Sequence, residues 1–101
     1  TKPDVMVLEK LYAHYRHPLT ACLLGHVRGV ICLLSAAENI SFYEYASTRI
    51  KKSIVGKGHA SKDQVQRMIE HLLNLRGPIQ QDVADALAIA IAHINISERN
   101  L

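Results

Sequence analysis

Apolar residues recur along this chain in patterns that differ between its first and second halves. Val5–Leu8 is a short continuous apolar run ending at Glu9, which is typical of a strand buried on both faces. From Pro18 to about Ala37 apolar residues recur at helical spacing, and proline suits the first position of a helix. Ser41–Tyr45 predicts a second short strand.

The second half of the chain predicts three helices. A short helix is expected through Ile54, and the glycine-containing stretch 55–59 predicts a loop. Ser61 and Gln64 form a capping-box pattern, so a helix begins there and ends before a Gly-Pro pair. The last helix, rich in Ala and Ile, is expected from about Gln81 to His93, with a frayed tail after it.

The order strand, helix, strand, helix, helix, helix predicts an α/β fold. A strand–helix–strand unit of this length implies two short parallel strands joined by a right-handed crossover. Two strands are too few for a stable sheet. Further strands must therefore come from a preceding portion of the protein or from another chain.

Composition is that of one ordered domain. The 101 residues are 49% hydrophobic and 21% charged, which excludes a disordered chain. No signal peptide is expected, and Arg28 with two glycines interrupts the best candidate for a membrane span.

Gly25 and Gly29, one turn apart in the predicted first helix, each cost up to about 1 kcal/mol of helix stability relative to alanine. Close approach to another backbone usually offsets such a cost.

The formal net charge of +3 is mild, but its distribution is uneven. Between positions 49 and 67 the only acid is Asp63, and the basic residues are Arg49, Lys51, Lys52, Lys57, Lys62 and Arg67. Such a patch is the usual footprint of a phosphate-binding surface, and the glycines of the 55–59 loop would let DNA approach the backbone. An ordinary solvated face would have the same composition, so both interpretations stay open.

Cysteine and histidine usage points away from a zinc site. Cys22 and Cys32 lie about 15 Å apart along one predicted helix and cannot form a disulfide with each other. We expect two buried free thiols in a reducing compartment. The six histidines have no partners at zinc-finger spacing. His14 and His17 lie in a polar loop after Glu9, where a DNA-facing role is open.

Three acids could carry chemistry. Asp82 and Asp85 share one face at the start of the last predicted helix. From spacing alone, acids in a first turn more often stabilise the helix dipole than bind a ligand. Glu9 ends a strand, where active sites of α/β proteins usually lie, although for a lone acid a solvated strand end is slightly more common. Together the three carboxylates would suit Mg²⁺.

Four blocks of sequence resemble those of RuvC-type Holliday-junction resolvases. The segment 82–93, Asp-Val-Ala-Asp-Ala-Leu-Ala-Ile-Ala-Ile-Ala-His, is similar to the last catalytic helix of that family. Residues 24–30, Leu-Gly-His-Val-Arg-Gly-Val, resemble its Gly-x-x-Arg-Gly helix. The stretch 50–65 resembles its basic segment, and 7–12, Val-Leu-Glu-Lys-Leu-Tyr, its strand ending in Glu followed by an aromatic residue. The blocks occur in the family's order and cover nearly the whole chain.

The resemblance implies an RNase-H-like fold that works as a cytoplasmic homodimer on four-way junction DNA, alongside branch-migration proteins. It implies two-metal phosphodiester hydrolysis with Mg²⁺, for which Mn²⁺ would substitute. Glu9, Asp82 and Asp85 would be metal ligands, and Lys62 would act at the scissile phosphate. The DNA contacts implied by the resemblance and the basic patch come from Tyr12, Arg16, Lys51, Lys52, Lys57 and Lys62.

The same resemblance implies that residues 1–101 are a partial domain. The family's opening strand with its first catalytic Asp, the next two strands and a helix have no counterpart here, so we expect little or no cleavage by this chain alone. An unpaired apolar strand edge predicts dimers or larger assemblies. The alternative function is a non-cutting module that binds junction DNA or associates with itself.

Overall fold

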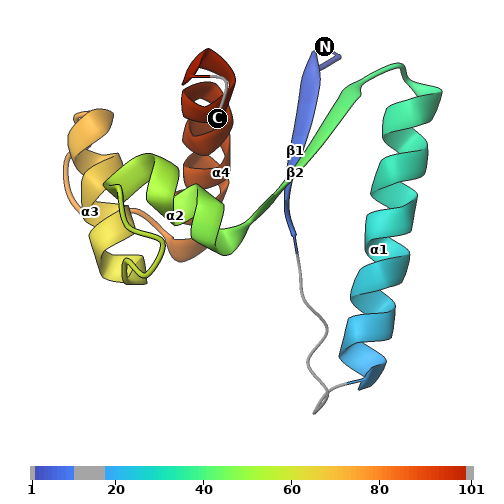
Figure 1. The fold of residues 1–101 in the computed structure, drawn as a ribbon, viewed down its shortest axis with the longest axis horizontal. Coiled ribbons are helices and arrows are strands. Elements are labelled where there is room, and N and C mark those ends of the chain that lie inside the picture. Colours follow the sequence, from blue (N-terminus) through green and yellow to red (C-terminus); the bar gives the residue numbers. More distant parts are fainter. Residues whose placement is uncertain (1, 11–17, 100–101) are drawn as a thin grey trace. The chain divides into compact units, whose positions relative to one another are not determined.

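The computed structural model describes residues 2–10 and 18–99 (Figure 1). Its elements, in chain order, are β1 (Val5–Lys10), α1 (Pro18–Ala37), β2 (Ser41–Ala46), α2 (Ser47–Val55), α3 (Lys62–Leu72) and α4 (Gln81–Arg99). The predicted α/β class and the order of elements are confirmed. The chain divides into two compact units, Thr1–Glu44 and Tyr45–Leu101.

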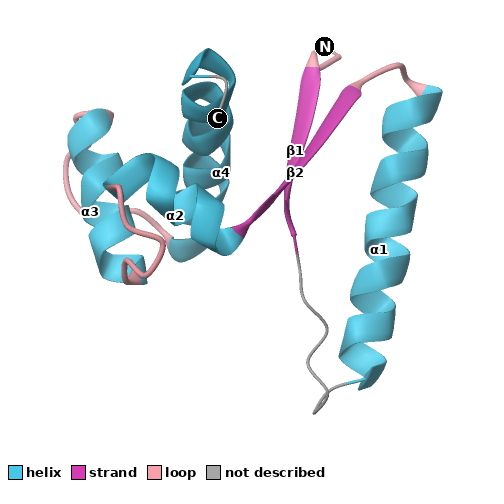
Figure 2. Ribbon diagram, viewed as in Figure 1, coloured by secondary structure: helices cyan, strands magenta, loops and turns pink. Residues whose placement is uncertain are grey.

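The first unit holds one helix and a two-stranded sheet, except for Tyr45 and Ala46 at the end of β2, which belong to the second unit. β1 and β2 are hydrogen-bonded neighbours and run parallel in the described part of the chain (Figure 2). α1 contacts this sheet through side chains: the Ser35 hydroxyl lies 3.3 Å from the Met6 sulfur. Because side chains alternate along a strand, Met6 and Lys10 face α1, whereas Glu9 faces the opposite side of the sheet.

The face of α1 that points away from the sheet is apolar and exposed. Leu19 is 80% exposed, Leu23 64%, Val30 55% and Leu33 68%. A Cβ added at Gly25 or Gly29 would meet no atom within 4 Å, so the close approach expected at these glycines does not occur within the described residues. No helix among the described residues is long and apolar enough to cross a membrane.

The expectation of two buried thiols is wrong for Cys22, which is exposed, whereas Cys32 is half-buried. Cys22 lies on the outward face of α1, because only one face of a helix can contact the two strands. Its sulfur is 3.9 Å from Nε2 of His26 one turn further on, so a basic partner is present that the sequence did not reveal.

The second unit is a cluster of three helices, in which α2, α3 and α4 each pack on the other two. Ile69 of α3 is fully buried at 0% exposure. Around it lie the other buried apolar residues of these helices, which are Ile50, Ile54, Val65, Ala84, Ala88, Ala92 and Ile96. Burying branched apolar side chains in this way contributes about 1.5–3 kcal/mol for each fully buried residue.

The end of α4 differs from the prediction. The helix was expected to stop near His93, but it continues to Arg99. Ile96 is 5% exposed and extends the buried alanine stripe by one turn, and the Asn95 side-chain amide donates to the Ser53 carbonyl of α2 at 3.1 Å. These contacts hold the last turns in place, although the polar sequence there predicted fraying.

Candidate functional site

Glu9 lies near the end of β1 and is half-buried. It faces away from α1, on the side of the strand that also carries Val5 and Val7. The carboxyl end of a parallel strand is where polar groups of α/β sites gather. Glu9 thus lies near a strand end as predicted, and its role as a metal ligand stays a prediction.

Asp82 and Asp85 lie at the start of α4, and both are exposed. The backbone N–H of Ala84 donates to the Gln80 carbonyl at 2.9 Å, which places Asp82 within the first helical turn. There the unpaired N–H groups and the helix dipole stabilise a carboxylate. Asp85 also accepts a hydrogen bond from the Gln81 side chain at 2.9 Å. Asp82 is thus favourably placed at the helix start, and both acids are exposed and open to a ligand.

The chemistry of these three carboxylates fits a hard divalent cation such as Mg²⁺. None of the ion pairs between described residues uses Glu9, Asp82 or Asp85. Within the described ranges, however, no cluster of three or more His, Cys, Asp or Glu side chains is arranged to hold a metal ion. Glu9 belongs to the first unit and the two aspartates to the second, so each group is described by itself.

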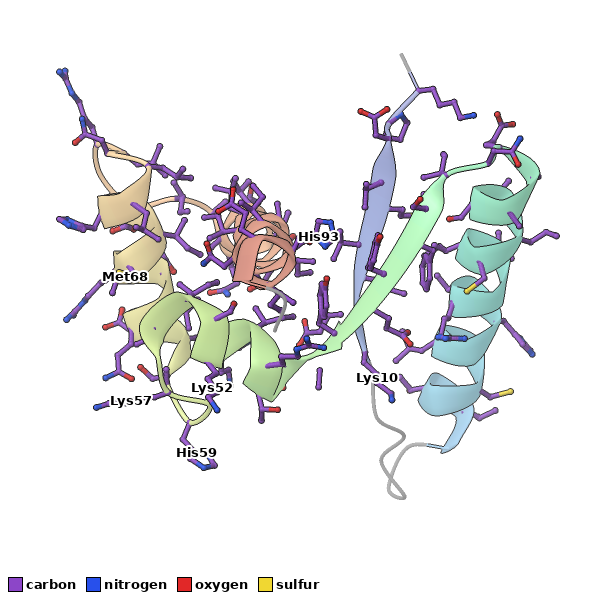
Figure 3. All side chains as sticks on the ribbon, turned by 45° about the horizontal axis from the view of Figure 1, so that its top comes forward. Lys10, Lys52, Lys57, His59, Met68 and His93 are labelled. Atoms are coloured by element: carbon purple, nitrogen blue, oxygen red, sulfur yellow. The ribbon has the colours of Figure 1, made fainter. Side chains whose placement is uncertain are left out.

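The four predicted lysines all belong to the second unit. Lys52, Lys57 and Lys62 are exposed and Lys51 is half-buried. Figure 3 shows Lys52, Lys57 and His59 projecting from α2 and the loop after it. The basic surface of α2, that loop and the start of α3 is therefore accessible to an anionic partner.

The loop between α2 and α3 begins at Gly56, which ends α2. Gly56 has φ of 90°, a left-handed conformation that favours glycine, and its N–H donates to the Lys52 carbonyl at 2.9 Å. A Cβ at Gly58 would lie 3.5 Å from the Thr48 carbonyl oxygen, an ordinary contact distance that does not require glycine. Gly56 alone of the two thus has a local structural role that is independent of DNA.

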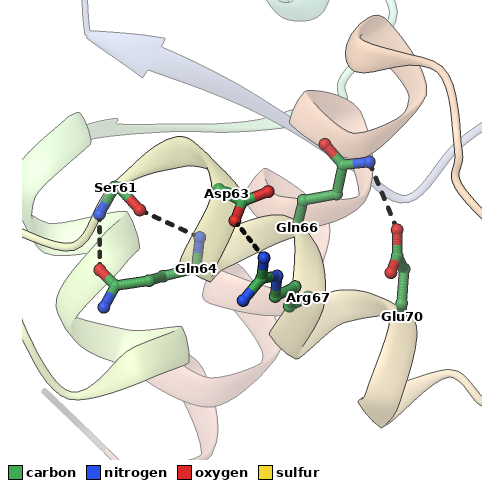
Figure 4. Close-up of polar contacts among 6 residues, drawn as sticks. All are labelled: Ser61, Asp63, Gln64, Gln66, Arg67 and Glu70. Carbon is green, nitrogen blue, oxygen red and sulfur yellow. Dashed lines mark hydrogen bonds and ion pairs between the residues drawn. The ribbon is translucent and has the colours of Figure 1, made fainter.

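The predicted capping box is confirmed at the start of α3 (Figure 4). The Gln64 N–H donates to the Ser61 hydroxyl at 3.1 Å, and the Ser61 N–H donates to the Gln64 side-chain oxygen at 2.8 Å. Lys62, the first residue of the helix, is thereby held at a fixed position. One turn on, Arg67 pairs with Asp63 at 2.9 Å, an exposed pair that contributes little stability.

Gln66 connects α3 to the segment that leads into α4. Its side-chain amide donates to the Ile79 carbonyl at 3.2 Å. The same amide donates to the Glu70 carboxylate at 3.3 Å, as Figure 4 shows. Ile79 is three residues before Asp82. The start of α4 is therefore tied to the same helix that carries Lys62.

Sequence reasoning left the role of Arg28 open and missed its partner, Glu44. The guanidinium binds the carboxylate through two hydrogen bonds of 2.6 and 3.0 Å, which join α1 to β2. The hydrogen bond from Arg28 lowers the pKa of Glu44 below its ordinary value, although burial opposes this, and the charges of Arg28 and Lys10 add to the lowering. The sequence did contain a signal for this pair, because α1 and β2 each carry one charged residue of opposite sign among mainly apolar residues.

A second pair was also missed. The Tyr45 hydroxyl at the end of β2 lies 2.7 Å from Nδ1 of His93 on α4. Helical spacing shows that His93 follows Asp82 on one face, but no sequence signal joins positions 45 and 93. Tyr12 and Arg16, two predicted DNA contacts, fall outside the residues that the structure describes, as do His14 and His17.

Comparison with known families gives one match over most of the chain. The family model described as "Crossover junction endodeoxyribonuclease RuvC" matches residues 1–93. Among curated proteins of that description, the one from Hydrogenovibrio crunogenus is 49% identical over 92 residues, covering 91% of this chain and 53% of that protein. The Rhodopirellula baltica protein is 47% identical over 89 residues, covering 87% and 50%. The chain thus spans about half the length of these relatives.

Two solved structures have the same fold. The Thermus thermophilus RuvC structure superposes with a TM-score of 0.84 at 27% identity, over 97% of this chain and 59% of that one. The values are the same for Thermus thermophilus RuvC in complex with a Holliday junction substrate. The resemblance identified from four sequence blocks is confirmed by both kinds of comparison.

Proposed function

The chain belongs to the RuvC family of crossover junction endodeoxyribonucleases, and from this premise we propose that it forms part of an endonuclease that resolves four-way DNA junctions in recombination and repair. The observation that carries the proposal is one helical unit with two exposed aspartates at the start of α4 and an accessible lysine surface on α2, α3 and their loop. Work on cellular DNA would place the protein in the cytoplasm.

We assign the metal-binding role to Glu9, Asp82 and Asp85, with Mg²⁺ as the ion and Mn²⁺ as a substitute. Their oxygen ligands and the absence of competing ion pairs between described residues support the assignment. When bound, divalent ions would lower the pKa of a water molecule and neutralise negative charge on the phosphate. Asp82 lies in the first turn of α4 and is exposed, so a cation can reach its carboxylate oxygens.

The lysines bind and orient the DNA backbone in this proposal. Lys62, fixed by the capping box, would lie at the scissile phosphate and stabilise the negative charge that builds up there. Lys51, Lys52 and Lys57 would bind adjacent phosphates, which positions the junction without reading its sequence. Tyr12 and Arg16 remain predicted DNA contacts.

Self-association is the second part of the proposal. Exposed apolar side chains on the outward face of α1, and glycines beside them with open space, support a helix surface that a second copy would cover. The two-stranded sheet of the described residues also offers a strand edge for pairing. A homodimer would match the two-fold symmetry of a four-way junction. A link to branch-migration proteins stays a prediction.

The test uses the longest form of the protein that contains this chain. Asp82→Asn should abolish junction cleavage in Mg²⁺ while gel-shift binding of the junction is retained, because the neutral side chain keeps its shape but loses the ligand charge. Asp63→Asn, which removes an exposed acid from α3, is the matched control and should cleave normally. Equal cleavage by Asp82→Asn and the unmodified protein would disprove the ligand role. Binding without any cleavage in the unmodified protein would instead favour the non-cutting module.

A further inference from the structure

The link between Tyr45 and His93 stands outside the proposed catalytic groups. Tyr45 is 6% exposed, and its hydroxyl lies 2.7 Å from Nδ1 of His93. The two rings are 5.9 Å apart between centroids, and the Arg49 guanidinium lies over the Tyr45 ring at 5.2 Å. Whichever atom carries the shared proton, a part-buried hydrogen bond joins Tyr45, near the end of β2, to α4.

His93 lies on the face of α4 that carries the candidate ligands. It follows Asp82 by eleven positions, which is about three turns, so the two side chains differ by roughly 20° around the helix axis. The distance between them along the axis is about 16 Å. A contact that fixes His93 around the axis of α4 therefore also fixes the direction in which Asp82 projects from the helix.

The apolar packing of α4 leaves that direction weakly defined. The stripe buried against α2 and α3 includes Ala84, Ala88 and Ala92. Most of this stripe consists of alanines, with Ile96 at its far end, so it has little ridge-and-groove relief to resist a turn about the axis. A specific polar contact on a neighbouring face supplies the missing constraint.

We propose that the Tyr45–His93 hydrogen bond is a positioning contact that fixes the rotation of α4 and, through it, the orientation of Asp82 and Asp85. This inference rests on the proposed metal-binding role of those aspartates. With side-chain oxygens about 5–6 Å from the helix axis, a rotation of 20° moves them by roughly 2 Å. Metal–ligand distances tolerate only about 0.2 Å, so a far smaller rotation already impairs binding. His93 acts through the helix and is not itself catalytic.

The experiment compares two ways of loosening α4. Tyr45→Phe and His93→Leu each remove the hydrogen bond to β2, while Asn95→Ala removes the hydrogen bond from the same helix to the Ser53 carbonyl of α2. His93→Asn is the conservative variant, since its carbonyl oxygen takes the place of Nδ1. Urea unfolding of each variant gives the loss of stability against which the other readouts are compared.

In the longest form of the protein, Tyr45→Phe and His93→Leu should weaken Mn²⁺ binding and lower kcat for junction cleavage about tenfold or more, the usual effect of losing a group that orients a metal ligand. The KM for junction DNA should not change. Asn95→Ala, at a similar loss of stability, and His93→Asn should keep kcat within about twofold. Equal losses of kcat in His93→Leu and Asn95→Ala would overturn the positioning role.

A structural measurement keeps the inference separate from the nuclease proposal. Residual dipolar couplings of the α4 amides should show a rotation of the helix in Tyr45→Phe and His93→Leu, and none in Asn95→Ala, whether or not the protein cuts DNA. If the unmodified protein does not cleave but the rotation is seen, the nuclease proposal fails and the positioning contact stands. An unchanged orientation of α4 in both variants refutes the positioning contact.

Discussion

Loss of the Ser61 cap should destabilise the chain and misplace Lys62. Ser61→Ala removes the hydroxyl that accepts the Gln64 N–H at 3.1 Å, which leaves a helix N–H without its partner. Since Ser61 is exposed, water replaces part of the lost bond, and the expected cost is about 1 kcal/mol, in the middle of the range for N-cap serines. For a domain of this size that cost lowers Tm by about 4–8 °C.

Urea unfolding at neutral pH measures this cost, with an unchanged m-value showing that only the midpoint has moved. Ser61→Asp is the matched control: it keeps an acceptor at the N-cap and adds a charge that the helix dipole favours, so its stability should equal or exceed that of the unmodified chain. If Ser61→Ala unfolds at the same midpoint as Ser61→Asp, the cap does not hold the helix.

The functional consequence follows from the position of Lys62 in the first turn of α3. Fraying of that turn lets the ammonium group move away from the proposed scissile phosphate, whereas Lys51 and Lys52 lie on another helix and keep their places. Junction cleavage by the longest form of the protein should therefore fall in Ser61→Ala while junction affinity changes little. A parallel fall of affinity and cleavage would count against a separate role for Lys62.

Two further outcomes are expected. The Arg28 hydrogen bond lowers the pKa of Glu44 from its ordinary value of 4.5, so the stability it contributes is fully present above that value and is lost as pH falls through the lowered pKa. The stability advantage of the unmodified chain over Glu44→Gln, from urea midpoints at several pH values, should thus shrink below pH 4.5; an advantage that grows in acid contradicts the pairing. On the outward face of α1, Leu33→Glu should convert dimers to monomers in analytical ultracentrifugation, whereas Leu73→Glu, an exposed leucine of the other unit, should not; an unmodified chain that is already monomeric at high concentration rules out that interface.

Local sequence signals predicted most of the elements, because their causes are local. The capping box of Ser61 and Gln64 and the helix-starting Pro18 act within a few residues and can be read directly. The last helix was predicted too short, because Ile96 and Asn95 are held by α2, and such tertiary contacts override a polar local sequence. Exposure of Cys22 was missed because its burial was inferred from the apolar helical stretch around it, and which face of that helix is covered depends on tertiary contacts.

The candidate site, like the fold, could be predicted from the sequence only in part. Its carboxylates and lysines could be named from residue type, helical spacing and resemblance, since each lies at a strand end or a helix start. The contacts that hold the supporting elements could not be named. Arg28 with Glu44 and Tyr45 with His93 join residues 16 and 48 positions apart, and only the folded chain brings them together.

The division into two units also separates the proposed functions. The unit Tyr45–Leu101 carries the four lysines and both aspartates around one apolar core, so the same helix packing fixes the distances among them. Glu9 lies in the other unit, where the Arg28–Glu44 pair joins β2, the neighbour of its strand, to α1. Unfolding of the three-helix core must therefore disturb phosphate binding and the aspartates together, whereas a change in the Arg28–Glu44 pair acts first on the sheet that carries Glu9. Junction binding that survives a loss of cleavage thus points to the sheet, to the aspartates and the contact that orients them, or to Lys62, and a joint loss points to unfolding of the helical core.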